Sequence, residues 1–155
     1  GSLRRRYLEQ EEGGGRVQAE AWLGRLAGRW QVARRIEDRL GPEGRFEGVA
    51  VFEPAAGGLD YTETGALVLG QGAPMRAGRR HLWRAEGARV VVYFADGRAF
   101  HDLDPEAARP AARHLCGADV YDVTYEFARW PDWETVWRVR GPRKDYRMIT
   151  RYAPG

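Results

Sequence analysis

The sequence predicts an all-β protein, an antiparallel β-barrel of about nine strands preceded by a short helix. Three observations support this. Apolar residues from 17 to 26 have helical spacing, the apolar period changes to two after Gly28, and about nine strand-like segments follow with short links. A meander of this kind closes most economically into a barrel, because closure leaves no unpaired strand edge. A β-sandwich is the alternative.

The N-terminal segment is predicted to be a flexible arm outside the folded domain. It is rich in charge, with three arginines at 4–6, and it ends in glycines at 13–15 that should stop any preceding helix. Residues 1–2 look like a remnant of cloning. Residues 16–155 then form one barrel domain, since their number suits a single core.

The first strand sets the alternation used for the whole barrel. Trp30, Val32, Arg34 and Ile36 share one face, and residues with the parity of Trp30 are expected to face the lumen. A helix-prone insert is expected at 104–112. The predicted strands cover residues 30–37, 45–53, 59–69, 76–85, 89–95, 98–103, 113–127, 133–140 and 143–152.

Composition excludes several classes of function. The apolar fraction of 43% and charged fraction of 30% indicate a globular chain. Beyond Ser2 there is no serine, and there is no asparagine, which rules out a serine-hydrolase triad and N-glycosylation. The single Cys116 cannot form an internal disulfide or a multi-cysteine zinc site. A net charge of +3 with no recognisable nucleic-acid motif predicts no nucleic-acid partner.

No cofactor, metal or membrane is predicted. The three histidines, His81, His101 and His114, lack the close spacing of metal ligands. The chain has no long apolar run and no signal-peptide pattern, so a soluble, cytoplasmic protein is expected. The sequence does not predict an oligomeric state.

The segment Leu26–Trp30 reads L-x-G-x-W and resembles the signature of lipocalins and other calycins. The resemblance implies a cup-shaped barrel with an internal cavity, closed at one end by the tryptophan, with an arginine of the last strand, Arg147 or Arg151, packed across it. More closely, the chain resembles an uncharacterised family of small bacterial calycin-like proteins, which implies a fold but no reaction. It lacks the repeated glycines of the haem-binding nitrobindins. The residues that carry this resemblance are G-R-W at 28–30, GLDYTETG at 58–65, DGRAFH at 96–101, HLCGADVY at 114–121 and GPRKDY at 141–146.

Alternation places charged residues inside the barrel. Arg34 and Glu63 share their faces with apolar residues, so an internal ion pair is predicted, either structural or part of a ligand site. Arg79, His81 and Trp83 also alternate together and are expected to face inward. The alternative register would instead bury the arginines at 76, 80 and 84.

A second polar group surrounds Gly117. His114 and Cys116 share one strand face, at a Cα separation of roughly 6.5 to 7 Å that strains a catalytic pair. A bulge at Gly117 would bring Asp119 and Tyr121 to the side of His114. This set supplies a base, an acid and a phenol, or it forms a structural polar network.

Lys144 is the only lysine and follows a Gly-Pro turn. With Tyr146 it is predicted to form a rim that binds anions. A Schiff base at Lys144 would require desolvation to lower the lysine pKa.

The predicted function is binding of a small polar or anionic, partly aromatic organic molecule in the barrel. One alternative is an isomerase or cyclase whose acid and base come from Glu63, His114, Asp119 and Tyr121. Another is a nucleic-acid or protein adaptor that uses the arginine-rich exterior. Whether the chain is an enzyme stays open at this point. The predicted ligand-binding residues are Arg34, Arg79, His81, Trp83, Tyr125, Trp137, Lys144 and Tyr146.

Overall fold

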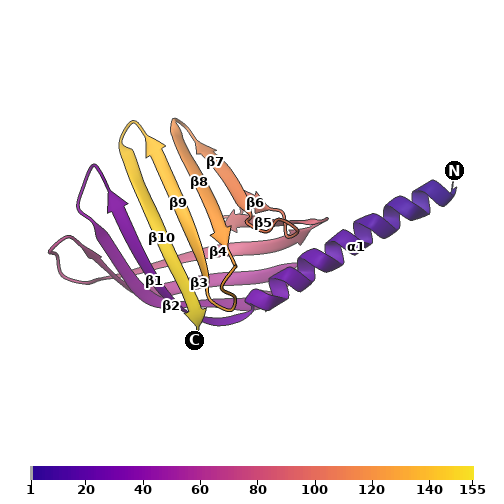
Figure 1. Cartoon of the computed structure of the whole chain (residues 1–155), viewed down its shortest axis with the longest axis horizontal. Coiled ribbons are helices and arrows are strands. Elements are labelled where there is room, and N and C mark those ends of the chain that lie inside the picture. Colours follow the sequence, from indigo (N-terminus) through magenta and orange to yellow (C-terminus); the bar gives the residue numbers. More distant parts are fainter. Residues whose placement is uncertain (1) are drawn as a thin grey trace.

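The computed structural model describes the backbone of residues 2–155 and the side chains of residues 14–155. Within this range, one helix, α1 (Ser2–Leu26), precedes ten strands (Figure 1). The strands are β1 (Gly28–Asp38), β2 (Gly44–Ala55), β3 (Gly58–Leu69), β4 (Met75–Glu86), β5 (Arg89–Phe94), β6 (Ala99–Leu103), β7 (Ala111–Cys116), β8 (Asp119–Glu126), β9 (Trp133–Gly141) and β10 (Lys144–Pro154).

The ten strands form one strongly curved antiparallel sheet (Figure 1). Strands that are neighbours in the chain pair with each other except at one place, between β6 and β7. β1 pairs with the last strand β10, with Val32 opposite Tyr152, which brings the two ends of the chain together. The sheet is therefore a nearly closed barrel whose two edges, β6 and β7, face each other. This confirms the predicted all-β antiparallel barrel and excludes the sandwich.

Two details of the predicted secondary structure are wrong. The segment 113–127 is not one strand but the hairpin β7–β8, which turns at Gly117, where φ is +59° and glycine is favoured. The protein therefore has ten strands rather than nine. The insert at 104–112, predicted to be helix-prone, forms turns and bends up to residue 110, and residues 111 and 112 already belong to β7.

The predicted break in the helix at 13–15 is also wrong. α1 continues through these glycines as a single helix. A Cβ on Gly15 would lie 2.7 Å from the Cβ of Ala88, so glycine lets the helix approach the β4–β5 turn closely, and this tertiary contact outweighs its low helix propensity. The boundary between an arm and the domain stays a prediction.

Within the described residues, no helix combines the length and the apolar character that crossing a membrane requires.

The C-terminal half of α1 lies across one end of the barrel. Its Ala19, Leu23 and Leu26 side chains are buried in the core. Trp22 stacks on Trp83 of β4, with ring centroids 6.5 Å apart. This end of the barrel is therefore covered by apolar side chains.

Trp30 lies at the same end of the barrel and is 5% exposed. Its indole N–H donates to the Leu26 carbonyl at 2.8 Å, which ties the first strand to the end of α1. Its ring meets Trp133 edge to face at 5.8 Å. The tryptophan of the L-x-G-x-W segment therefore packs in the core, as the resemblance implied.

The arginine that the resemblance places across Trp30 is not found there. Arg147 and Arg151 of β10 lie on the outer face, because they alternate with the buried Met148 and Tyr152. Their side chains form exposed ion pairs with Glu37 and Glu134 at 3.3 and 3.2 Å.

Candidate functional site

The lumen-facing side chains enclose a cavity of about 310 Å³. Nine of the twelve predicted site residues line it, and the remaining three, His114, Asp119 and Lys144, do not. The lining residues are Arg34, Tyr61, Glu63, Arg79, His81, Trp83, Val92, Phe94, Phe100, His101, Tyr121, Tyr125, Trp133, Thr135, Trp137, Tyr146, Met148 and Tyr152.

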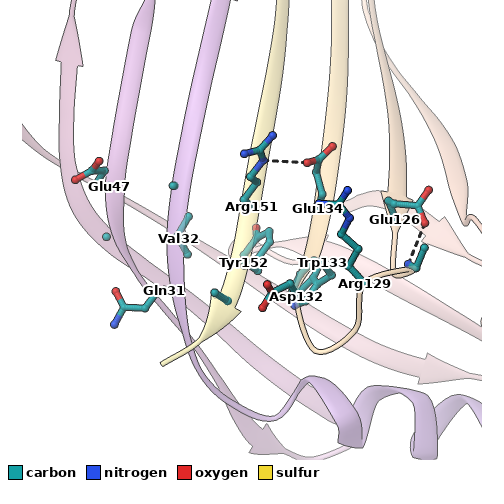
Figure 2. Close-up of a pocket in the computed structure, with 14 residues that line it drawn as sticks. Gln31, Val32, Glu47, Glu126, Arg129, Asp132, Trp133, Glu134, Arg151 and Tyr152 are labelled. Carbon is teal, nitrogen blue, oxygen red and sulfur yellow. Dashed lines mark hydrogen bonds and ion pairs between the residues drawn. The ribbon is translucent and has the colours of Figure 1, made fainter.

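A larger hollow of about 810 Å³ lies on the outside of the barrel (Figure 2). Charged side chains of the outer sheet face surround it, such as Glu47 and the Arg151–Glu134 ion pair. These charged side chains are exposed to water or form ion pairs. None of them therefore needs a further partner. The lumen is different, because it holds a buried ion pair, Arg34 with Glu63, and the candidate site is therefore the lumen.

The predicted ion pair between Arg34 and Glu63 is present at the centre of the lumen. The guanidinium donates to both carboxylate oxygens, at 2.8 and 2.7 Å. Arg34 Nε donates to Thr150 Oγ1 at 2.8 Å, and the Tyr61 hydroxyl donates to Glu63 Oε1 at 2.6 Å. The two charged side chains are only 6% and 1% exposed. This network fixes both charges in place.

The surroundings keep both partners ionised. Burial alone would raise the pKa of Glu63, but the hydrogen bonds and attraction of Arg34 outweigh it, and the pKa is lowered. Burial alone would lower the pKa of Arg34, but the hydrogen bond with Glu63 and nearby acidic groups outweigh it, and the pKa is raised. Glu63 is thus a carboxylate whose oxygens already accept strong bonds, which makes it a poor general base.

Arg79 is the second cation of the lumen and is only loosely held. Its Nε lies 3.8 Å from Glu63 Oε2, and its side chain is 41% exposed. Its Nη2 has a weak contact of 3.8 Å with the Met148 sulfur. Arg79 therefore keeps N–H donors that an anion entering the cavity can use.

The predicted face of β4 is correct. Arg79, His81 and Trp83 all line the cavity, whereas the arginines at 76, 80 and 84 do not. His81 Nδ1 lies 3.3 Å from the Tyr93 carbonyl oxygen. Because a carbonyl oxygen only accepts, Nδ1 carries the hydrogen. Burial lowers the pKa of His81, so the ring is neutral at pH 7 and its Nε2 has a free lone pair.

A β-bulge adds Phe100 to the site, which alternation does not predict. Val92 pairs with His101 and Tyr93 with Ala99, which leaves Phe100 without a partner on β5. As a result the consecutive residues Phe100 and His101 both line the cavity, which a regular strand does not allow.

His101 is buried and neutral. Its Nε2 lies 2.8 Å from the Tyr125 hydroxyl, and burial lowers its pKa to about 3. Burial also raises the pKa of Tyr125 well above its usual value, so this side chain is a neutral phenol. The two groups therefore form an uncharged hydrogen-bonded pair.

Three buried nitrogens in the described residues have no hydrogen-bond partner. They are Trp83 Nε1, Trp133 Nε1 and His101 Nδ1. The three side chains are 5%, 3% and 7% exposed, and all of them line the cavity. A buried polar group without a partner costs about 1 to 3 kcal/mol.

The group around Gly117 comes together through a turn and not through the predicted bulge. In the β7–β8 hairpin, His114 lies directly opposite Tyr121, and Cys116 lies opposite Asp119. Tyr121 lines the cavity, whereas His114 and Asp119 do not. The predicted neighbourhood is correct, but only the phenol of Tyr121 reaches the lumen.

Lys144 belongs to this group at the rim and does not line the cavity. Its Nζ donates to the Tyr121 hydroxyl at 2.7 Å and lies 3.0 Å from Asp119 Oδ2. The hydrogen bonds to Tyr121 and Asp119 raise the pKa of Lys144 above its usual value. The amine is therefore protonated at pH 7, which argues against the Schiff base. Tyr146, its partner in the predicted rim, does line the cavity.

Several lining residues could have been found from the sequence. Trp133 and Thr135 share the parity of Trp137, and Tyr61 shares that of Glu63, so alternation alone places them in the lumen.

No group of three or more histidine, cysteine, aspartate or glutamate side chains in the described part of the chain is arranged to hold a metal ion.

The comparisons with known proteins concern the whole barrel. Residues 26–154 match a protein family described as a family of unknown function (DUF6314). The chain belongs to this family. No curated protein matches this DUF6314 chain in sequence. Among solved structures it is similar to the S-type phycobiliprotein lyase CPES from Guillardia theta, with a TM-score of 0.61 and 8% identity over 90% of this chain and 96% of that chain. At this identity the likeness shows a shared barrel fold alone.

Proposed function

We propose that this DUF6314 barrel binds a small, anionic and partly aromatic organic molecule in its cavity. The observation that carries the proposal is the loosely held Arg79 guanidinium in a cavity walled by aromatic side chains. An anion can accept hydrogen bonds from this cation while the apolar part of the same molecule packs on the rings. The charge and the shape of the lumen narrow the kind of ligand.

The lumen holds more cationic donors than anionic acceptors. The carboxylate of Glu63 is occupied by Arg34 and Tyr61. Arg79 keeps free donors, and the charges of the two arginines exceed that of Glu63 by one. A ligand that carries a carboxylate or a similar anion complements this environment, because it brings acceptors and a negative charge.

Aromatic rings form the walls of the cavity. Trp133 and Tyr152 stack at 3.7 Å, and Phe100 and Trp137 stack at 4.9 Å. Flat, apolar walls of this kind suit an aromatic ring in the ligand. The volume of about 310 Å³ corresponds to roughly ten water molecules at about 30 Å³ each, so the ligand is compact.

The isomerase or cyclase that the sequence suggested, with its acid and base among Glu63, His114, Asp119 and Tyr121, has less support. Glu63 is a saturated carboxylate, and His114 and Asp119 lie outside the cavity lining. The structural neighbour is named as a phycobiliprotein lyase, so a barrel of this shape is compatible with an enzyme as well as with a binding protein. Fold similarity does not decide between the two.

Binding of 3-phenylpropionate, a compact aromatic carboxylate, tests the proposal by isothermal titration calorimetry. We expect Arg79→Gln to weaken binding by about tenfold or more, because a hydrogen bond to a charged group contributes about 1.5 to 3 kcal/mol. Arg80→Gln is the matched control, since Arg80 is the next residue on β4 and does not line the cavity. Equal loss of affinity in the two variants would contradict a lumen site.

A further inference from the structure

Tyr121 has a phenolic hydrogen that is directed away from its only hydrogen-bond partner among the described residues. Its oxygen lies 2.7 Å from Lys144 Nζ. An ammonium group has three donors and no acceptor, so the Tyr121 oxygen accepts this bond and its own hydrogen is free for another acceptor. The Tyr121 side chain lines the cavity, where a ligand can supply that acceptor.

Lys144 holds the Tyr121 oxygen in place. Its Nζ is 2.7 Å away and donates to that oxygen, so the hydroxyl hydrogen points elsewhere. Asp119 holds the ammonium in place through a contact of 3.0 Å. Tyr121 is thus equipped to act as a proton donor, and Lys144 and Asp119 are its positioning residues.

His81 supplies the opposite capacity in the same cavity. Its Nδ1–H is anchored on the Tyr93 carbonyl, which leaves the lone pair of Nε2 free to accept a proton. The ring is buried against Phe100, with centroids 5.5 Å apart, and lines the cavity together with Arg79. A bound molecule therefore meets a base on β4 and an acid on β8.

We propose that the cavity catalyses keto–enol isomerisation of an aromatic 2-oxo carboxylate, with His81 as the base and Tyr121 as the acid. This inference rests on the proposed binding function, since Arg79 takes the carboxylate and the aromatic walls take the ring. An acid and a base that line the same cavity are the minimum equipment for this reaction.

The reaction balances without a cofactor. His81 Nε2 takes a proton from the carbon next to the keto group, and the electron pair of that C–H bond forms the C=C bond. The π electrons of the carbonyl move to its oxygen, which takes the phenolic proton of Tyr121. The enol leaves as an isomer of the substrate. The proton on His81 is then lost to solvent, and Tyr121 regains one from solvent.

Phenylpyruvate in D₂O provides the test, since catalysed enolisation replaces its benzylic hydrogens with deuterium and proton NMR follows the loss of signal. We expect exchange by the wild-type protein well above a buffer blank. His81→Gln and Tyr121→Phe are each expected to lose about 100-fold or more of this rate, the usual contribution of a general acid or base.

The positioning role of Lys144 is tested through charge rescue. We expect Lys144→Met to slow exchange without loss of 3-phenylpropionate binding, and Lys144→Arg to recover part of the rate, because arginine keeps the cation beside the phenol. Arg143→Met is the matched control, since Arg143 is exposed, adjacent and outside the cavity lining, and it should exchange at the wild-type rate.

Each outcome decides between the two proposals. If 3-phenylpropionate binds but phenylpyruvate shows no exchange above the blank, the catalytic inference is wrong and the binding function stands. If 3-phenylpropionate does not bind to the wild-type protein, both are wrong. Exchange that persists in both His81→Gln and Tyr121→Phe would overturn the assignment of base and acid.

Discussion

Replacing Glu63 with alanine is expected to destabilise the protein by about 3 to 5 kcal/mol, the typical cost of removing one partner of a buried ion pair. The change leaves the Arg34 guanidinium charged in the lumen, where the remaining side-chain hydrogen bond is the one to Thr150. It also removes the acceptor of the Tyr61 hydroxyl. Urea unfolding at pH 7 measures the free energy of unfolding.

The double variant distinguishes a coupled pair from two independent losses. Arg34→Ala together with Glu63→Ala is expected to cost less than the sum of the single changes, with a coupling of about 0.5 to 3 kcal/mol. The exposed pair of Arg113 and Asp122 is the control, because it has a similar two-bond geometry in water, and it should couple more weakly. Strict additivity for Arg34 and Glu63 would contradict the lumen network.

Trp30→Ala is expected to destabilise the protein by about 3 to 5 kcal/mol, as large-to-small changes of buried aromatic residues do. The side chain is 5% exposed, packs on Trp133 and bonds to the end of α1. Its removal opens a cavity between the helix and the barrel. Thermal and urea unfolding both report the loss.

Two further variants separate packing at Trp30 from its hydrogen bond. Trp30→Phe keeps an aromatic ring but loses the N–H that bonds to Leu26, so it should cost less than Trp30→Ala. Trp130→Ala is a surface control, since Trp130 contacts Trp30 but is 41% exposed. If Trp30→Ala and Trp130→Ala cost the same, Trp30 does not close the barrel.

The fold was predictable because alternation is a local property of the sequence. The change of period at Gly28 and the face shared by Trp30, Val32 and Arg34 are read directly from neighbouring residues. The hairpin turn at Gly117 was harder to predict, because a glycine within a strand pattern suits a bulge as well as a turn. Its positive φ becomes visible only in the structure.

The site was predictable where alternation alone decides it. Arg34, Glu63 and His81 lie in the lumen as expected, since each follows the parity of its strand. The inward position of Phe100 depends on the β-bulge opposite Val92 and Tyr93, which the sequence does not mark. Alternation also cannot say how far along the barrel axis a residue lies. For this reason Lys144 was expected at the ligand, whereas it contacts the hydroxyl of Tyr121 and does not line the cavity itself.

The most direct measurement follows the tryptophan indole N–H signals in ¹H–¹⁵N NMR spectra during titration with 3-phenylpropionate. The account predicts that the signals of Trp83 and Trp133 shift, because both side chains line the cavity and lie beside the bound aromatic ring, whereas Trp30 keeps its bond to Leu26 and its signal stays in place. The shifts should require much more ligand in Arg79→Gln. Signals of Trp83 and Trp133 that remain unchanged, or a shift confined to the exposed Trp130, would contradict ligand binding in the lumen.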